Sequence, residues 1–424
     1  MLTDLYKSRD LCFYGAPRPP QCRITYISAA RFPVQANLID FCRGLLSAIL
    51  SLSMGLFGHK QPKSFLGVDI GASSIKVIEF EARKGRPMLM TYGYAEIPTE
   101  EAGESLFDQP KRTGELLAHI CKEAGTKSTS AMAALPTSHV FAAILSMPDG
   151  KDARLRQAAV DAEVAKLAPL PLSEMIIQTT YLDEEQKSEK KGGKVEKVAE
   201  VEKTKQKQFR AMVTGSAKTF IQKYIEIFKG AKLNLQAIDT ESLALVRALV
   251  GKDKGAIMVI DIGSQRTTLM VVEKGIPFVS RSIQLGGDTV TRALMSTMNL
   301  GEEDAERIKR DLGTASPGGS GLPGGLPRVL EALMLPLVNE IQFAMQLYAG
   351  MELAMIKKVE KIIVTGGSSH LPRVPEYLAE TLNMNVYRGD PWARVLFPQD
   401  LTSVLEEIGP RMSVAIGLAM REME

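Results

Sequence analysis

Two aspartate–glycine turns with matching flanks carry the residues whose types could bind a phosphate. The first follows an apolar segment at 65–70 and the second follows one at 257–262, with Asp69 and Asp261 at equivalent places. Each turn leads into another apolar segment, which is typical of two strands joined by a tight turn. A glycine at such a turn lets backbone N–H groups approach a phosphate, because it has no Cβ. The repeat therefore predicts two phosphate-binding hairpins.

Small and hydroxyl-bearing residues accompany both turns and are the predicted phosphate ligands. They are Gly71, Ala72, Ser73 and Ser74 in the first copy, and Gly263, Ser264 and Thr267 in the second. The two aspartates would repel a phosphate directly, but they could hold a Mg²⁺ through the waters that this ion tends to keep. We therefore expect Asp69 and Asp261 to face a water-coordinated Mg²⁺.

The distance between the turns, 261 − 69 = 192 residues, indicates a duplicated domain and not a solenoid repeat. One such turn alone is more typical of a plain hairpin, since Asp and Gly are ordinary turn residues. Two copies with matching flanks favour a pair of hairpins that hold a triphosphate between them.

Two further segments fit a nucleotide site. A strand expected at 361–365 ends in Gly366, Gly367 and Ser368, where an adenine or ribose could lie against the backbone. The alternative is an ordinary strand-to-helix turn. Glu306 and Lys309 lie three residues apart in a helical segment at 305–313. They could contact the sugar and base, or form a solvated surface pair.

The composition is that of a globular protein, with 424 residues, 45% of them hydrophobic and 24% charged. A chain of this length is expected to form at least two lobes. The net charge of +3 is too small to indicate nucleic-acid binding. The four cysteines, Cys12, Cys22, Cys42 and Cys121, are spaced for neither a disulfide framework nor a zinc site, which fits a reducing cytoplasm.

The first part of the chain differs from the rest. Residues 1–53 contain four prolines, three cysteines and little periodicity. The apolar run at 44–57 is shorter than the roughly 20 residues of a membrane-spanning helix. We expect residues 1–60 to be an extension outside the fold, with Met54 as the natural start of translation. A disordered or membrane-touching arm is the alternative.

Taken in order along residues 64–424, these motifs resemble those of the actin-like ATPase superfamily, which includes actin, the DnaK-type chaperones, MreB, FtsA and sugar kinases. The turns look like its two phosphate motifs, residues 364–369 like its adenosine motif, and helices at Glu241 and 415–419 like its two connecting helices. The resemblance implies a duplicated, ribonuclease H-like α/β fold of two lobes that binds ATP and Mg²⁺. Asp261 and Gln265 are then, by position, the candidates for activating an attacking water.

Within that superfamily, four stretches resemble the PilM family of type IV pilus assembly proteins, namely residues 57–71, 134–171, 229–241 and 282–288. This resemblance implies a cytoplasmic component of the inner-membrane platform that assembles the pili of twitching motility. It also implies binding to the cytoplasmic N-terminal peptide of PilN and contact with other platform proteins and assembly ATPases. The membrane would be reached only through partners, and a homo-oligomer is compatible with this.

The same resemblance divides the chain. The first lobe (1A) takes residues 64–135 and 211–254, and the chain returns to it at 396–424. Residues 136–210 form an FtsA/PilM-type 1C subdomain with a charged loop at 183–208. Residues 255–395 form the second lobe (2A/2B) with a Gly/Pro-rich loop at 313–327. Both loops are expected to be surface insertions.

Other functions on the same fold stay open. A small-molecule kinase would need an acceptor site, but residues 136–210 show no obvious sugar-binding cluster. An FtsA-like filament protein would end in an amphipathic membrane helix, whereas this sequence stops at Glu424, directly after the second connecting helix. The same ending disfavours a chaperone, which needs a substrate-binding domain. ATP hydrolysis is expected to be slow at most, because the sequence identifies no certain base.

Overall fold

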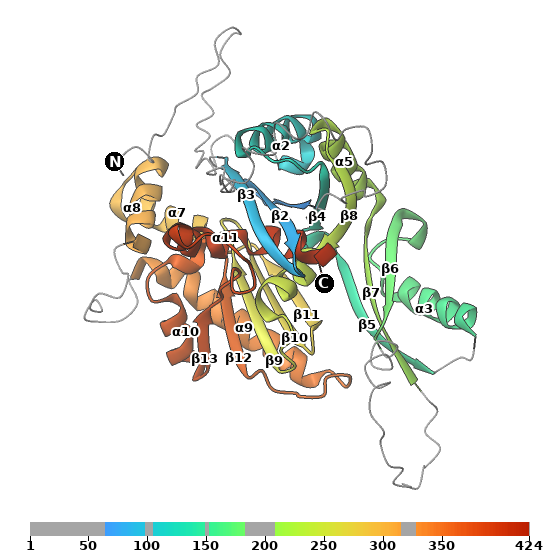
Figure 1. Ribbon diagram of the computed structural model, residues 1–424. Helices are drawn as coiled ribbons and strands as arrows, with labels where there is room; N and C mark the ends of the chain where they lie inside the picture. The colour runs from blue at the N-terminus through green and yellow to red at the C-terminus, as the bar shows by residue number, and fades with distance from the viewer. Residues whose placement is uncertain (1–63, 98–104, 149–151, 183–207, 315–327, 424) are drawn as a thin grey trace, which may run out of the picture.

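The computed structural model describes residues 64–97, 105–148, 152–182, 208–314 and 328–423. The predicted extension at 1–60 lies outside them, as do nearly all of the charged loop at 183–208 and of the Gly/Pro-rich loop at 313–327. Three sheets organise the described residues (Figure 1). Within these ranges, no helix combines the length and apolar character needed to cross a membrane.

The first sheet has the strand order β3-β2-β1-β4-β8 and contains the Asp69 turn. Its strands are β1 (Ser64–Ile70), β2 (Ser74–Arg83), β3 (Arg86–Glu96), β4 (Ser130–Leu135) and β8 (Asn234–Thr240). The first three are antiparallel, because only tight turns join them, whereas β4 and β8 add in parallel after longer connections. Helices α2 (Pro110–Ala124) and α5 (Lys218–Gly230) pack on the outer face of this sheet.

The second sheet repeats this plan in the order β11-β10-β9-β12-β13. Its strands are β9 (Ala256–Ile262), β10 (Thr267–Glu273), β11 (Ile276–Ile283), β12 (Lys361–Thr365) and β13 (Asn385–Arg388). Its helices are α7 (Gly287–Met298), α8 (Glu302–Thr314), α9 (Arg328–Gly350) and α10 (Val374–Leu382). Both aspartate turns join the first two strands of their sheets, so the predicted duplicated α/β architecture is confirmed.

Two helices lie between the sheets (Figure 1). They are α6 (Glu241–Leu245), which continues into a π-helical turn at Val246–Val250, and α11 (Thr402–Met420). Alternate strand residues point to opposite faces of a sheet. Ile257 and Val259 accordingly pack toward α6 and α11, while Met258 and Ile260 face the outer helices. Each sheet therefore has one face on the central helices and one on its own outer helices.

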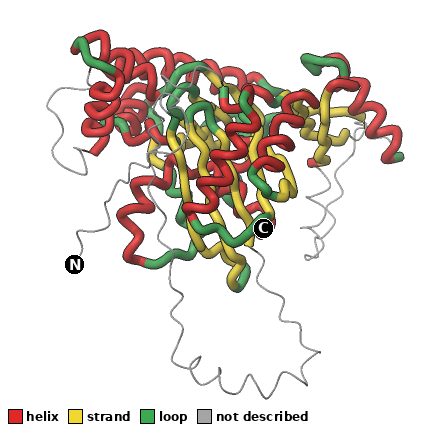
Figure 2. Tube along the Cα trace, turned by 90° about the horizontal axis from the view of Figure 1, so that it is seen from above, coloured by secondary structure: helices red, strands yellow, loops and turns green. Residues whose placement is uncertain are grey.

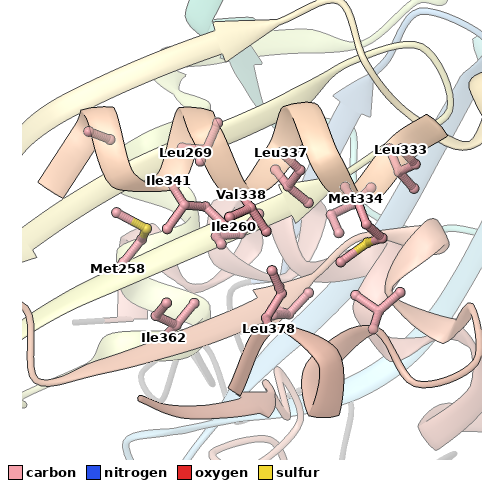
Figure 3. Packing of buried hydrophobic residues seen from close by; sticks show 14 of the residues in the cluster. Met258, Ile260, Leu269, Leu333, Met334, Leu337, Val338, Ile341, Ile362 and Leu378 are labelled. Carbon is pink, nitrogen blue, oxygen red and sulfur yellow. The ribbon is translucent and has the colours of Figure 1, made fainter. Parts of the chain in front are cut away.

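Helix α9 anchors the second sheet. Its residues Leu333, Met334, Leu337, Val338 and Ile341 recur at helical spacing and point at β9, β10 and β12 (Figure 3). Four of the five are fully buried and Val338 is nearly so. Burying a side chain of this size contributes about 1.5–3 kcal/mol, so this stripe holds firmly the sheet that carries the second turn.

A third, smaller sheet with the order β5-β7-β6 is inserted between β4 and α5. It consists of β5 (Phe141–Pro148), β6 (Met175–Tyr181) and β7 (Gln208–Ala217), with α3 (Ala153–Leu167) packed on it. The Asp152 carboxylate caps α3 by accepting from the N–H of Arg154 at 2.9 Å. Figures 1 and 2 show this unit projecting from one side of the main body.

Candidate functional site

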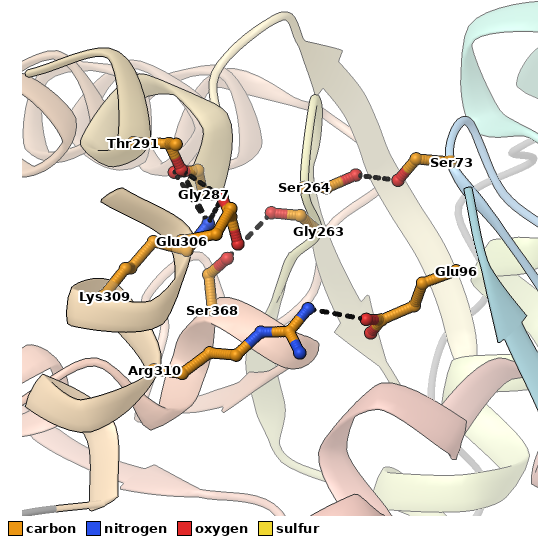
Figure 4. Close-up of polar contacts among 10 residues, drawn as sticks. All are labelled: Ser73, Glu96, Gly263, Ser264, Gly287, Thr291, Glu306, Lys309, Arg310 and Ser368. Carbon is orange, nitrogen blue, oxygen red and sulfur yellow. Dashed lines mark hydrogen bonds and ion pairs between the residues drawn. The ribbon is translucent and has the colours of Figure 1, made fainter. Parts of the chain in front are cut away.

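The two predicted turns face each other. The Oγ atoms of Ser73 and Ser264 lie 2.7 Å apart (Figure 4). An equivalent hydrogen bond closes each turn. The N–H of Gly71 donates to the carbonyl of Ser74 at 2.8 Å, and the N–H of Gly263 donates to the carbonyl of Arg266 at 2.9 Å. Residues predicted from both copies of the repeat therefore meet at one place between the first and second sheets.

Beside the turns, three carboxylates and one ammonium group lie close together, with Asp69 buried and Lys76, Asp261 and Glu241 half-buried. Lys76 Nζ donates to Asp69 Oδ2 at 2.7 Å. Burial alone would lower the pKa of Lys76, but the charges of Asp69, Asp261 and Glu241 outweigh burial and raise that pKa above its ordinary value. Lys76 is therefore charged at neutral pH, and it is the cation that partly offsets these acids.

The strand register explains how Lys76 reaches this place. In the first hairpin Asp69 lies opposite Lys76, and in the second hairpin the residue opposite Asp261 is Thr268. The position opposite the aspartate therefore carries a positive charge in the first hairpin and a neutral hydroxyl in the second. Sequence reasoning missed Lys76, although counting across the four residues 71–74, which separate the paired Ile70 and Ile75, would have placed it beside Asp69.

Two of the carboxylates have raised pKa values. Burial raises the pKa of Asp261 to about 6, with Lys76 opposing the shift and Asp69 adding to it. Burial and then the Asp69 charge raise the pKa of Glu241 to about 7. The N–H of Thr137 donates to Glu241 at 2.8 Å and its hydroxyl at 3.2 Å, and both bonds oppose that shift. A carboxylate that titrates near neutral pH can accept a proton from water, so Glu241 joins the candidate bases.

Replacing Glu241 with glutamine is expected to stabilise the ligand-free protein at pH 8 by about 1–3 kcal/mol, while leaving it little changed at pH 4.5. The folded pKa of about 7 lies above the ordinary value of 4.5. Stability due to Glu241 is therefore present at low pH and is lost as the pH rises through this interval, because ionisation is unfavourable in the folded state. Thermal unfolding between pH 4.5 and 8 measures the difference. Exposed Glu115 of α2, changed to glutamine, is the control, and parallel curves for wild type and Glu241→Gln would contradict the expectation.

The residues predicted for the sugar and base gather on the side of the second sheet (Figure 4). Lys309 Nζ donates to Glu306 Oε1 at 2.5 Å and to Thr291 Oγ1 at 2.8 Å. The Lys309 side chain is 14% exposed and that of Glu306 is 30% exposed, so the pair is half-buried. Ser368 Oγ donates to the carbonyl of Gly263 at 3.0 Å, which ties the end of β12 to the second turn.

Close approach explains the glycine at position 366. Its φ is +87°, and a Cβ there would lie 2.3 Å from Asp261 Oδ1. Only glycine fits such a backbone and such a contact. By contrast, a Cβ on Gly367 would meet no atom closer than 3.9 Å. The Asp261 carboxylate therefore lies directly against the predicted adenosine segment as well as beside the second turn.

Thr267 is placed differently from the other predicted phosphate ligands. It is fully buried, and its hydroxyl donates to the carbonyl of Leu285 at 2.6 Å. It is the first residue of β10, so its side-chain direction is set by the strand. Ala72 and Gln265 are half-buried within the first and second turns. The Thr267 hydroxyl is thus used in a hydrogen bond within the second lobe, whereas Ser73 and Ser264 lie where the turns meet.

The donor set fits a hydrated Mg²⁺. Within the described ranges, no three His, Cys, Asp or Glu side chains are arranged to hold a metal ion. Asp69 and Asp261 nevertheless supply hard carboxylate oxygens on the two turns, and one lysine leaves the three acids with excess negative charge. Oxygen ligands from one or two carboxylates and waters are what Mg²⁺ prefers.

Known proteins resemble this chain over most of its length. Residues 67–423 match the family model described as type IV pilus assembly protein PilM. A chain in the solved PilM-PilN type IV pilus biogenesis complex is 23% identical, with a TM-score of 0.68, covering 86% of this chain and 100% of that one. That likeness confirms the actin-like fold.

Two other relatives are more distant. FtsA of Bacillus subtilis is 25% identical over 213 residues, which cover 46% of this chain and 47% of FtsA. The chain thus spans about half the length of the curated relatives it matches. MreB 5 of Spiroplasma citri, solved bound to AMPPNP, is 13% identical, with a TM-score of 0.43 over 84% of this chain and 95% of that one.

Proposed function

The chain belongs to the PilM family of type IV pilus assembly proteins, and we propose that it acts in pilus biogenesis as an ATP-binding scaffold. Mg-ATP would bind where the two turns meet and would hold the two lobes together. In that closed form the protein would bind the cytoplasmic N-terminal peptide of a PilN-like inner-membrane protein. The contact of Ser73 with Ser264 at 2.7 Å carries the nucleotide part of this proposal, because it brings both predicted phosphate hairpins to one place.

In this proposal the backbone N–H groups and hydroxyls of the two turns bind the phosphates. The Lys76 ammonium group lies beside the first turn, 3.8 Å from where a Cβ on Gly71 would be. Asp69 and Asp261 would hold Mg²⁺ through water, and the ion when bound would offset the negative charge of the phosphates. The adenosine would lie against the end of β12 and the inward face of α8. The residues proposed there are Gly366, Gly367, Ser368, Glu306 and Lys309.

Hydrolysis is proposed to be slow and secondary to binding. Asp261 and Gln265 are the candidates, from their positions, for activating the attacking water. Glu241 is a third candidate because its pKa of about 7 suits proton transfer. However, Glu241 already accepts two hydrogen bonds from Thr137. Both bonds fall on Oε2, so they fix the orientation of the carboxylate and occupy the lone pairs of that one oxygen.

A short segment links the nucleotide turns to the third sheet. The 3₁₀ turn Thr137–His139 leads into β5, and it contacts both Glu241 and the second hairpin. Arg266, next to that turn, donates to the hydroxyl of Ser138. The His139 ring stacks on Phe220 of α5 at 4.0 Å. A change at the turns would therefore reach the junction between the first and third sheets.

This link supports coupling between ATP and a peptide. A chain of the same fold was solved in a PilM-PilN complex, and a PilN-like protein is the partner that we propose. We assign the first sheet to the 1A unit, the third sheet to the 1C unit and the second sheet to the second lobe, with the 1C unit extended past residue 210 to the end of β7 at Ala217. Attachment through this partner would place the protein at the cytoplasmic side of the inner membrane. Contacts with other platform proteins, assembly ATPases or further copies belong to the same proposal.

Calorimetry with Mg-ATP and with a synthetic peptide of the PilN-like N-terminus tests the proposal. Asp261→Asn is expected to weaken Mg-ATP binding roughly 10- to 100-fold, because it removes a charged partner of the ion. Saturating Mg-ATP should tighten peptide binding, and the peptide should tighten Mg-ATP binding by the same factor. Asp304→Asn is the control, because Asp304 pairs with exposed Arg307 on the same helix α8. Wild-type protein without affinity for Mg-ATP would overturn the nucleotide part, and equal peptide affinity with and without it would overturn the coupling.

A further inference from the structure

A carboxylate outside the predicted motifs joins the two sides of the candidate nucleotide site. Glu96 is the last residue of β3, and its Oε2 atom accepts a hydrogen bond from Arg310 Nη2 of α8 at 2.8 Å (Figure 4). Its other oxygen, Oε1, accepts a hydrogen bond from Arg411 Nη1 of α11 at 2.9 Å. A single side chain of the first sheet therefore contacts a helix of the second sheet and one of the central helices.

Each of the three residues is adjacent to a predicted nucleotide segment. In the β2–β3 pair Glu96 lies opposite Ser74 of the first turn, and the next residue, Ile97, donates its N–H to the carbonyl of Ser73 at 2.8 Å. Arg310 directly follows Lys309 on α8. The position of Glu96 is thus tied to the first turn on one side and to the predicted sugar-binding helix on the other.

The second arginine reaches the adenosine segment. Arg411 follows Pro410, whose carbonyl accepts from the N–H of Gly366 at 3.0 Å. The Arg411 guanidinium also lies over the Tyr94 ring at 5.4 Å, which packs it against β3. Through these contacts Glu96 connects the first turn, α8 and the end of β12, which are the three segments proposed to surround ATP.

We propose that Glu96 is a positioning residue for nucleotide retention, which holds Arg310 and Arg411 so that the two sides of the site stay closed. This rests on the proposed ATP binding and adds a residue that controls release. Closing a site over a bound ligand mainly lowers its dissociation rate. The pairs are partly exposed, with side-chain exposures of 33% for Glu96, 60% for Arg310 and 27% for Arg411. Each pair therefore contributes modestly and is screened by salt.

The test is the dissociation rate of N-methylanthraniloyl-ATP, a fluorescent ATP analogue, from the full-length protein with Mg²⁺, chased with excess ATP. Glu96→Gln and Arg310→Gln are each expected to release it roughly three- to tenfold faster, as loss of one or two such pairs allows. The double variant should be no faster than the faster single variant, because both remove the same link. Raising the salt concentration should shrink the gap to wild type.

Arg307→Gln is the matched control, since Arg307 lies on the same helix but pairs with Asp304 at 2.7 Å and not with the first sheet. Thermal unfolding distinguishes positioning from a general structural role, because exposed substitutions should change stability by about 0.5 kcal/mol or less. Unchanged release from both single variants, or additive effects in the double variant, would overturn the role of Glu96. Failure of the wild type itself to bind the analogue would instead overturn the proposed function, and this inference with it.

Discussion

Replacing Lys76 with methionine is expected to lower the free energy of unfolding by about 3–5 kcal/mol at pH 8, the usual cost of removing one partner from a buried ion pair. Methionine has nearly the length of lysine without its charge, so the packing volume is largely kept. The Asp69 carboxylate would lose its 2.7 Å partner. Asp261 and Glu241 would lose the positive charge that now acts on them.

The loss should depend on pH in a defined direction. With the ammonium removed, the acids can avoid repulsion only by binding protons, and burial already raises the pKa values of Asp261 and Glu241 to about 6 and about 7. The free energy of unfolding of the variant should therefore be closest to that of the wild type near pH 5, and the difference should grow as the pH rises through these values. Urea unfolding at several pH values measures this. Mg-ATP affinity should also fall, because the phosphates would meet uncompensated carboxylates.

A more exposed pair of the same chemistry supplies the control. Lys361 Nζ lies 2.6 Å from Asp253 Oδ2, with side chains 27% and 37% exposed. Lys361→Met should lower the free energy of unfolding by about 1 kcal/mol or less, since water can solvate the Asp253 carboxylate once the lysine is gone. Equal losses for the two variants, or a Lys76→Met loss that does not change with pH, would contradict the charge-compensation account.

The repeat of the Asp69 and Asp261 turns predicted the fold well, because it depends only on local patterns. An apolar strand, a glycine turn and a second strand can be recognised within 16 residues of each copy, at 65–80 and 257–272. Two such copies at a distance of one lobe limit the architecture to a duplicated one. The strand order around each turn matches that expectation.

The site was less predictable, because the residues that the sequence patterns did not identify depend on strand register and on contacts between distant segments. Thr267 was grouped with the phosphate ligands for its hydroxyl, but β10 begins at this residue and its hydroxyl bonds to Leu285. Glu241 was assigned only to a connecting helix, since nothing local shows that the fold buries it beside Asp69. Glu96 meets Arg310 and Arg411 across 214 and 315 residues, and such pairs follow only from the assembled lobes.

Replacing Gly417 with alanine is expected to destabilise the protein by about 3 kcal/mol, the upper part of the usual range for overpacking. A Cβ at this position would lie 1.8 Å from the carbonyl oxygen of Ala244 and 2.5 Å from its carbon. Both are backbone atoms of α6, so no side-chain rotation relieves the contact. Two residues earlier on α11, the carbonyl oxygen of Ala415 would lie 2.0 Å from a Cβ on Gly67 of β1. The central helix is therefore held at backbone contact with α6 and with the strand that leads into the first turn.

Because α6 begins at Glu241, pushing α6 away from α11 should also weaken Mg-ATP binding, which local damage far from the site would not do. Urea unfolding and calorimetry on the same preparation measure the two effects. Gly350→Ala is the matched control, since Gly350 is also helical and a Cβ there would meet nothing within 4 Å. Alanine favours a helix over glycine by about 1 kcal/mol at most, so the control should be neutral or slightly stabilised. If Gly417→Ala behaved like the control, the two central helices could not be packed as closely as this structure has them, and the coupling of α11 to the acids of the site would fail with that packing.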